Sequence, residues 1–216
     1  MNHRSAMGVV VSETRITLKT THMATKSIKG TKTESLLLSA YLAESAAYSR
    51  YTYYAQQATK EKYFPVAEVF NETAANELRH GKVFFKMLQG GMVEVPVNTD
   101  AGVIGTTVEN LAYAIAEEER EGVEFYTNAA KVATDEGFKE IASHFLAIAE
   151  VERHHHDRFM KYKEYIENGT LWKRDKKVTW RCLVCGYESE GTEPPKTCPG
   201  CDHPYQHYIC VQDLEM

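Results

Sequence analysis

The chain has 216 residues, 43% of them apolar and 25% charged, with a formal net charge of −5. This composition indicates a globular protein of one or two domains and argues against collagen, a coiled-coil rod or a disordered chain. No apolar run approaches the roughly 20 residues that cross a membrane, and the acidic body of the chain argues against nucleic-acid binding.

The first 33 residues differ in composition from the rest. They carry six lysines and arginines against one acidic residue, are rich in threonine and serine, and show no helical periodicity. They also lack an apolar stretch of the length that a secretion signal needs. A vestigial transit peptide, an appended tag or a start codon placed too early, with Met23 as an internal start, would each explain them. We therefore expect residues 1–33 to be a disordered extension.

Four long helices are predicted between residues 34 and 168, because apolar residues recur there at spacings of three and four. The first covers about residues 34–61, and its inner stripe comprises Leu37, Tyr41, Glu44, Tyr48, Tyr51 and Ala55. The second begins near Pro65, which suits a first helical turn, and ends at Gly90-Gly91. Its stripe comprises Phe70, Glu77, His80, Phe84 and Met87.

The segment from Gly90 to Gly105 has no helical period and is long enough to cross from one end of a bundle to the other. Thr106 and Glu109 have the spacing of a capping box and begin the third helix. The stripe of this helix comprises Leu111, Ala114, Glu118, Glu121 and Phe125. The fourth helix covers about residues 135–167, and its stripe comprises Phe145, Ile148, Glu152, His155, Phe159 and Tyr162.

The expected fold is therefore an all-α four-helix bundle over residues 34–168, with a long crossover between its second and third helices. A charged linker follows at residues 169–177. Residues 178–216 form a separate small domain, which is too short to fold without a metal.

The inner stripes carry charged residues where a core should be apolar: Glu44, Glu77, Glu118, Glu121, Glu152, His80 and His155. Burying five unpaired carboxylates would be strongly unfavourable, whereas two iron ions would neutralise them. Residues three apart project from one helix face, and two Glu-x-x-His pairs with a glutamate from each of the other helices are the ligands of di-iron bundles. Glu77 with His80 and Glu152 with His155 have this spacing. The stripes therefore predict a di-iron site.

Other polar residues near the stripes are assigned to the surface. Those that fall off the stripes and are predicted to be solvated are Glu117, Glu119, Glu124 and Glu150. Of three consecutive histidines, only His155 follows Glu152 by three residues, so His154 and His156 are predicted to be exposed. Tyr51 and Tyr126 are either core aromatics or hydroxyl donors at the metal site, and position alone does not decide between these roles.

Four of the five cysteines form two pairs with the spacing of a metal site: Cys182-x-x-Cys185 and Cys198-x-x-Cys201. A disulfide framework is not expected, because about 180 residues precede the first cysteine and no secretion signal is visible, so a reducing cytoplasm is the better assignment. Spacing alone leaves a zinc ribbon and an iron site equally open. Gly186, Pro199 and nearby aromatic residues favour an iron site of the rubredoxin type. Cys210 has no partner and is predicted to be a plain thiol.

These motifs, in this order, resemble the rubrerythrin family. The likeness covers about residues 34–208 and rests on Glu44-Ser-Ala-Ala-Tyr-Ser-Arg-Tyr51, Glu77-x-x-His80, Glu118-x-x-Glu121, Glu152-x-x-His155, Cys-x-x-Cys-Gly-Tyr and Cys-Pro-x-Cys-x-His-Pro. The resemblance implies a ferritin-like di-iron domain followed by a rubredoxin-like iron-binding domain. The basic head, the triple histidine and Cys210 lie outside the family pattern.

The resemblance also implies a role for each ligand. Glu77 and Glu152 would bridge both irons, and Glu44 would bind the first. Glu118 and His155 would bind the second iron. Glu121 and His80 would alternate on the first iron as the redox state changes, while Tyr51 and Tyr126 would donate hydrogen bonds. A third iron would be held by Cys182, Cys185, Cys198 and Cys201.

The implied activity is that of a non-haem di-iron peroxidase, which reduces hydrogen peroxide to water and protects against oxidative stress. Its electrons would pass through the four-cysteine iron from an external rubredoxin or NAD(P)H-dependent reductase, in a cytoplasmic homodimer or larger oligomer. Two alternatives stay open, namely a ferritin-like ferroxidase and a zinc-ribbon adaptor without turnover. The pair of Glu118 and Glu121, with an attached one-electron centre, argues against the ferroxidase.

Overall fold

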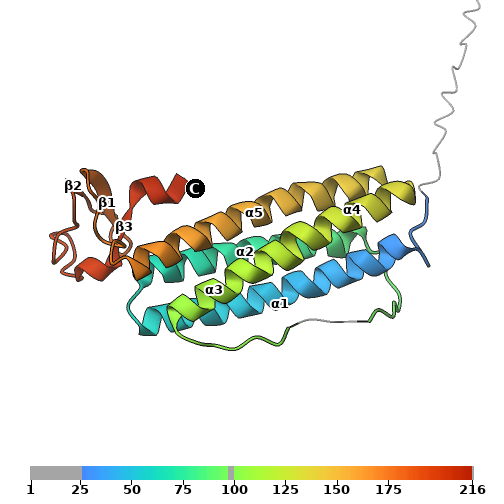
Figure 1. The fold of residues 1–216 in the computed structure, drawn as a ribbon, viewed down its shortest axis with the longest axis horizontal. Helices are drawn as coiled ribbons and strands as arrows, with labels where there is room; N and C mark the ends of the chain where they lie inside the picture. The colour runs from blue at the N-terminus through green and yellow to red at the C-terminus, as the bar shows by residue number, and fades with distance from the viewer. Residues whose placement is uncertain (1–25, 97–99, 216) are drawn as a thin grey trace, which may run out of the picture.

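The computed structural model describes residues 26–96 and 100–215, with the backbone alone for Glu121 and Glu215. Its helical part comprises α1 (Lys32–Lys60), α2 (Phe64–Met87), α3 (Thr107–Glu117), the π-helix η1 (Glu118–Phe125), α4 (Tyr126–Asp135) and α5 (Lys139–Glu167). Because α3, η1 and α4 follow one another without a break, they form one long rod, which packs lengthwise with α1, α2 and α5 (Figure 1). The described parts of the connection from α2 to α3 run along the bundle, as predicted for a crossover.

Local sequence signals set the helix starts. The Thr31 side chain caps α1 by accepting a hydrogen bond from the backbone N–H of Glu34. Pro65 lies in the first turn of α2, where its missing N–H removes no helical hydrogen bond. Thr106 and Glu109 form the predicted capping box in both directions. The starts of the first three helices therefore lie close to where the sequence predicts them.

The expectation that residues 1–33 lie outside the fold is corrected for the last eight of them. Ile28 is 2% exposed and belongs to the apolar core at that end of the bundle. The Lys29 ammonium lies 2.6 Å from the carboxylate of Glu34. Residues 26–33 therefore pack on the bundle through Ile28, with Lys29 paired to Glu34. The composition of this stretch does not indicate these contacts. Residues 1–25 lie outside the described residues.

The third and fourth helices differ in two details from the prediction. Eight residues in the middle of the third rod form the π-helix η1 instead of continuing as α-helix. Short π-helical turns within α-helices are frequent at functional sites. The fourth helix begins at Lys139 and not at about residue 135, since Gly137 has a φ of 82° and ends the preceding rod.

The bundle core is divided into two apolar clusters. The cluster next to the small domain includes Tyr51, Phe70 and Phe159. The cluster at the opposite end includes Phe84, Tyr126 and Phe145. The glutamates and histidines of the inner stripes lie between them, so the polar site is enclosed by apolar packing along the bundle axis.

The small domain is a three-stranded antiparallel sheet in the order β2-β1-β3. Its elements are β1 (Val178–Cys182), β2 (Glu188–Gly191), β3 (Tyr208–Cys210) and the 3-10 helices η2 (Tyr205–His207) and η3 (Val211–Glu215). Trp180 pairs with Ser189 on one side and Cys210 on the other, and it is fully buried. The buried core of this domain consists of Trp180, Tyr208 and three cysteines, Cys182, Cys198 and Cys210. So small an apolar core fits a domain that depends on a metal.

The small domain packs on the end of the bundle (Figure 1). The Phe64 ring at the start of α2 stacks on His207, with 3.7 Å between ring centroids. Trp172 stacks nearly parallel on Tyr63 and donates a hydrogen bond to the backbone carbonyl of Tyr208. The predicted linker at residues 169–177, which contains Trp172, is therefore part of the packing between the domains.

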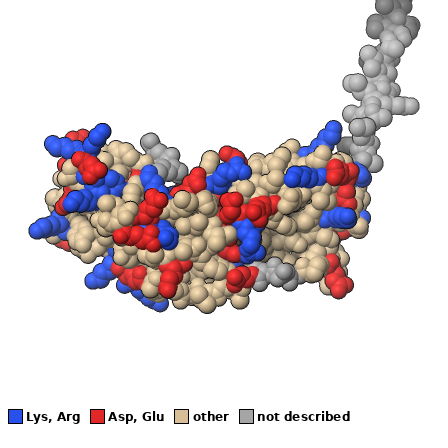
Figure 2. Space-filling model, in the orientation of Figure 1, with Lys and Arg blue, Asp and Glu red and all other residues tan. Residues whose placement is uncertain are grey.

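No helix in the described ranges combines the length and apolar character that spanning a bilayer requires. Figure 2 shows one face of the molecule, on which basic and acidic side chains are intermixed along the bundle. This face therefore presents a mixed charge distribution of the kind that keeps globular surfaces hydrated.

Candidate metal centres

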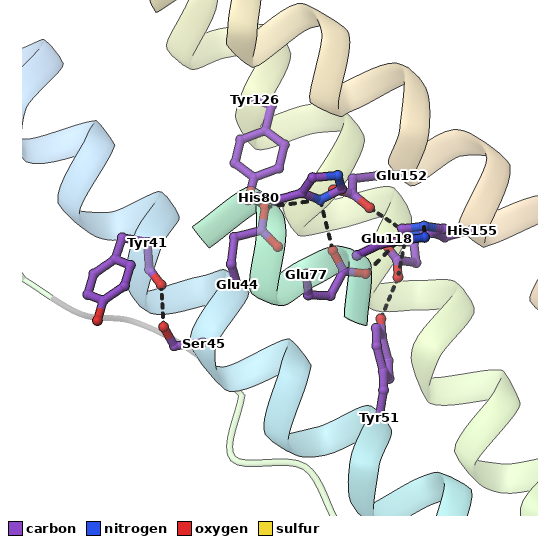
Figure 3. Close-up of polar contacts among 11 residues, drawn as sticks. Tyr41, Glu44, Ser45, Tyr51, Glu77, His80, Glu118, Tyr126, Glu152 and His155 are labelled. Carbon is purple, nitrogen blue, oxygen red and sulfur yellow. Dashed lines mark hydrogen bonds and ion pairs between the residues drawn. The ribbon is translucent and has the colours of Figure 1, made fainter. Parts of the chain in front are cut away.

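Four carboxylates and two imidazoles converge in the middle of the bundle (Figure 3). They come from all four rods: Glu44 from α1, Glu77 and His80 from α2, Glu118 from η1, and Glu152 and His155 from α5. The four carboxylates and His155 are buried, and the His80 side chain is 13% exposed. The predicted stripes are thus brought together at one place.

The converging atoms form two overlapping sets of ligands. One set consists of Glu44, Glu77, His80 and Glu152. The other consists of Glu77, Glu118, Glu152 and His155. Within each set the ligand atoms lie within 4.8 Å of one another. Glu77 and Glu152 belong to both sets, which is the arrangement that two neighbouring metal ions with shared carboxylates require.

Both imidazoles turn Nδ1 toward the shared carboxylates. Nδ1 of His80 lies 3.0 Å from Oε2 of Glu77 and 2.9 Å from Oε1 of Glu152. Nδ1 of His155 lies 2.7 Å from Oε2 of Glu152 and 3.1 Å from Oε1 of Glu77. Each nitrogen carries at most one hydrogen, so Oε1 of Glu77 and Oε1 of Glu152 are buried without a hydrogen bond. Metal ions would bind these oxygens and the nitrogens facing them, so the residues fit a di-iron centre.

The pKa shifts at the site show that added positive charge would stabilise it. Burial and the charges of Glu77 and Glu152 raise the pKa of Glu44 well above its ordinary value. Burial and the same two charges also raise the pKa of Glu118. Burial opposes protonation of His80, but its close contacts with the carboxylates of Glu152 and Glu77 raise its pKa to about 9. Each of these shifts favours uptake of a proton, and bound cations supply the same charge.

Two tyrosine hydroxyls donate to the carboxylates from opposite ends of the site. The Tyr51 hydroxyl donates a 2.5 Å hydrogen bond to Oε1 of Glu118, and the Tyr126 hydroxyl donates to Oε1 of Glu44. Both rings are buried in the apolar clusters. Sequence position left two roles open for these residues, and the structure gives them both: each is a core aromatic and a hydroxyl donor.

Gly122 permits η1 to approach α5 at the site. A Cβ atom at this position would lie 2.4 Å from Cβ of Glu152, well inside contact distance. Glycine is therefore required for Glu118 and Glu152 to face each other at this point. Its signal in the sequence is a glycine within a helical pattern, which usually has a packing reason. The side chain of Glu121, the predicted alternating ligand, lies outside the described residues.

One assignment near the site was wrong. Glu117 was predicted to be solvated, but it is 5% exposed. Its carboxylate lies 3.2 Å from the guanidinium of buried Arg50 and 2.5 Å from that of Arg120. Helical position alone missed this because the partner, Arg50, comes from another helix. The exposure of Glu119, Glu124 and Glu150 agrees with the prediction.

Asn76 is a further residue that the sequence did not single out. Its side-chain amide lies 3.4 Å from Nε2 of His155, the ring nitrogen that faces away from the carboxylates. Histidine ligands usually hold their second nitrogen by such a contact, which orients the ring. An asparagine next to Glu77 in a helix carries no pattern from which this contact could be found.

The three consecutive histidines give a direct test of the ligand assignment. The side chains of His154 and His155 are 68% and 5% exposed, as predicted. His156 was also predicted to be exposed, but its side chain is only 19% exposed, and it pairs with Asp157. We expect His155→Ala to lose the binding of one iron, because one ligand set loses its nitrogen. His154→Ala and His156→Ala should leave the iron content unchanged, as measured by metal analysis of purified protein. Equal losses from all three variants would contradict the assignment.

The four paired cysteines converge in the small domain. Sγ of Cys182 lies 3.7 Å from Sγ of Cys201, and Sγ of Cys185 lies 3.6 Å from Sγ of Cys198. A disulfide would require about 2.05 Å. A tetrahedron with metal–sulfur bonds of about 2.3 Å has edges of roughly 3.8 Å, so the cysteines fit one metal ion. Cys185 is exposed, which places one ligand at the surface.

Comparison with family models gives two matches. The rubrerythrin model matches residues 35–107 and 109–181, and the model of the rubredoxin-like domain of rubrerythrin matches residues 180–209. The chain is 45% identical over 183 residues to the rubrerythrin of Porphyromonas gingivalis, which covers 85% of this chain and 92% of that protein. It is 40% identical to the rubrerythrin of Nitratidesulfovibrio vulgaris, with 85% and 96% covered.

Solved structures show the same fold at lower identity. Nigerythrin in its mixed-valence state has a TM-score of 0.57 at 23% identity, covering 95% of this chain and 100% of that chain. A bacterioferritin from Desulfovibrio desulfuricans has a TM-score of 0.55 at 23% identity and covers 63% of this chain and 81% of that chain. The predicted ferritin-like bundle with a small rubredoxin-like domain is therefore confirmed.

Proposed function

Because the chain belongs to the rubrerythrin family, we propose that it is a peroxidase that reduces hydrogen peroxide to two waters. Its cofactors are a di-iron centre in the bundle and one iron in the rubredoxin-like domain. The observation that carries the proposal is the pair of buried ligand sets that share Glu77 and Glu152. Such a pair holds two metals close enough to act on one small substrate.

Within this proposal each ligand has a distinct task. Glu77 and Glu152, which belong to both ligand sets, would hold both irons, and Glu44 would complete the first site. Glu118 and His155 would complete the second site. His80 and Glu121 would be the two ligands that exchange at the first iron when its redox state changes. The partial exposure of the His80 side chain, at 13%, is consistent with a ligand that has room to move.

The overall reaction takes up two electrons and two protons for each peroxide. Two ferrous ions, when bound, supply one electron each and act as Lewis acids. Tyr51 and Tyr126 hold their hydroxyl protons on the carboxylates of Glu118 and Glu44. These hydroxyls fix the carboxylates in place and are proton-bearing groups at the site. The apolar clusters at both ends keep bulk water away from it.

In this proposal the four cysteines would hold an iron that supplies one-electron transfer to the di-iron centre. An external rubredoxin or an NAD(P)H-dependent reductase would deliver the electrons, and the exposed ligand Cys185 offers a point of contact. The small domain packs at the start of α2, whereas Glu77 lies 13 residues further along, which corresponds to roughly 20 Å of helix. We therefore propose a homodimer or larger oligomer in which the cysteine site of one chain serves the di-iron site of another.

The compartment proposed is the cytoplasm. All five cysteines are free, and four of them face a metal position. Thiols in this state persist in reducing compartments, whereas secreted proteins form disulfides.

The proposal is tested by oxidising the reduced holoprotein. Protein purified without oxygen should contain about three irons per chain and, when fully reduced, should be oxidised by stoichiometric hydrogen peroxide much faster than by air, followed through its visible spectrum. Faster oxidation by air, or iron loading well beyond this content, would favour the ferritin-like ferroxidase. Zinc in the cysteine site would favour the adaptor, because zinc has no redox chemistry.

A further inference from the structure

The di-iron site is closed along the axis of the bundle. On one side, the rings of Phe84 and Phe145 lie 5.2 Å apart beside Tyr126. On the other side, Phe70 and Phe159 lie 5.1 Å apart beside Tyr51. These buried rings leave no axial route for a substrate among the described residues, so a substrate must enter between two helices.

A pocket opens on the side of the site between α1 and η1. Its inner wall is formed by the ligands Glu44, Glu77 and Glu118. Three small residues also line it, namely Ala43 and Ala47 on α1 and the buried Gly122 on η1. Ala43 and Ala47 are one helical turn apart on the same face, and both are half-buried. The pocket thus joins the outside of the bundle to the ligand carboxylates.

The size and polarity of this pocket suit a very small neutral molecule. Its volume of about 20 Å³ gives room for roughly one water-sized molecule. The tyrosines that donate to the ligand carboxylates, Tyr51 and Tyr126, also line it. The one positive side chain in its described lining, Arg50, is paired with Glu117 at 3.2 Å and therefore offers little net charge to an anion.

We propose that hydrogen peroxide enters through this pocket, and that Ala43 and Ala47 limit entry to small peroxides. A larger side chain at either position would fill the outer part of the pocket, whereas the ligands themselves would keep their places. Alkyl hydroperoxides would be excluded because their carbon groups exceed the pocket volume of about 20 Å³. This inference rests on the proposed peroxidase activity and adds to it a substrate class and the residues that select it.

The route is tested with leucine at each alanine in the iron-loaded, full-length protein. Ala43→Leu and Ala47→Leu should slow binding of nitric oxide to the reduced di-iron centre, and its oxidation by hydrogen peroxide, by about tenfold or more. Stopped-flow spectroscopy measures both rates, and metal analysis should show unchanged iron content. Ala75→Leu, at an exposed alanine on α2, is the matched control and should leave both rates unchanged. Wild-type rates in both pocket variants, with full iron, would overturn the route.

The size limit is tested by the relative rates with two peroxides, and the route by a smaller substitution at Ala47. Ala47→Gly should raise the rate with tert-butyl hydroperoxide relative to that with hydrogen peroxide, and an unchanged ratio would overturn the size limit. If leucine prevents iron loading, Ala47→Val takes the smaller step, and wild-type nitric oxide binding in that variant would equally overturn the route. Slower nitric oxide binding in a protein that peroxide does not oxidise would uphold the route while refuting the peroxidase activity.

Discussion

Replacing Glu77 by glutamine should remove both metals of the bundle and leave the metal of the four cysteines in place. Glu77 belongs to both ligand sets, and its two oxygens face different histidines, His80 and His155. Glutamine has the same size but no charge, and it offers one oxygen in place of two. The iron content, measured on protein purified without oxygen, should fall from about three to about one per chain.

The control for this prediction is Glu68→Gln on the same helix. Glu68 is exposed, so its variant should keep the full iron content. Wild-type protein should also have a higher melting temperature than Glu77→Gln, because bound metal stabilises the folded state. A chelator should remove most of that difference, whereas a difference caused by packing alone would persist. Retention of both bundle metals by Glu77→Gln would refute its place as a shared ligand.

The ligands could be predicted because helical geometry is regular over long distances. Glu77 with His80 and Glu152 with His155 are three residues apart on stripes that must face inward, so their convergence follows from the helix period. The cysteines of each pair are three residues apart, so their spacing is also visible within a short segment. In each case the information lies within one segment, and a short sequence window contains it.

Features that depend on packing between segments could not be predicted in the same way. The π-helix η1 does not have the α-helical period from which the stripe of the third helix was predicted. Glycine is required at position 122 because a side chain there would collide with Glu152 of α5. Glu117 is buried because Arg50, 67 residues earlier, neutralises it. From composition, residues 26–33 were predicted to belong to the disordered extension, but Ile28 is part of the apolar core. The burial of Gly122, Glu117 and Ile28 thus depends on partners that are distant in the sequence.

Replacing Cys198 by serine should unfold the small domain while leaving the di-iron site intact. Cys198 is fully buried, and its sulfur is one of four that converge on a single position. A domain of about 40 residues buries too little apolar surface to fold alone, so its metal supplies much of its folding free energy. We expect the loss of about one iron per chain and the transfer of Trp180 from a fully buried position into water. Metal analysis and the tryptophan emission maximum measure these two changes.

Cys210→Ser is the matched control for this loss, because Cys210 is also buried but its sulfur faces Gln212 and not the other four. It should keep three irons and the emission of the wild type. In the peroxidase assay, Cys198→Ser should still be oxidised by one equivalent of peroxide after chemical reduction, yet fail to turn over with the physiological type of donor. That combination separates the electron path from the site of reaction, because the di-iron ligands lie in the other domain. Turnover at the wild-type rate by Cys198→Ser would show that electrons bypass the cysteine site, and an equal loss of iron in Cys210→Ser would contradict the choice of ligands.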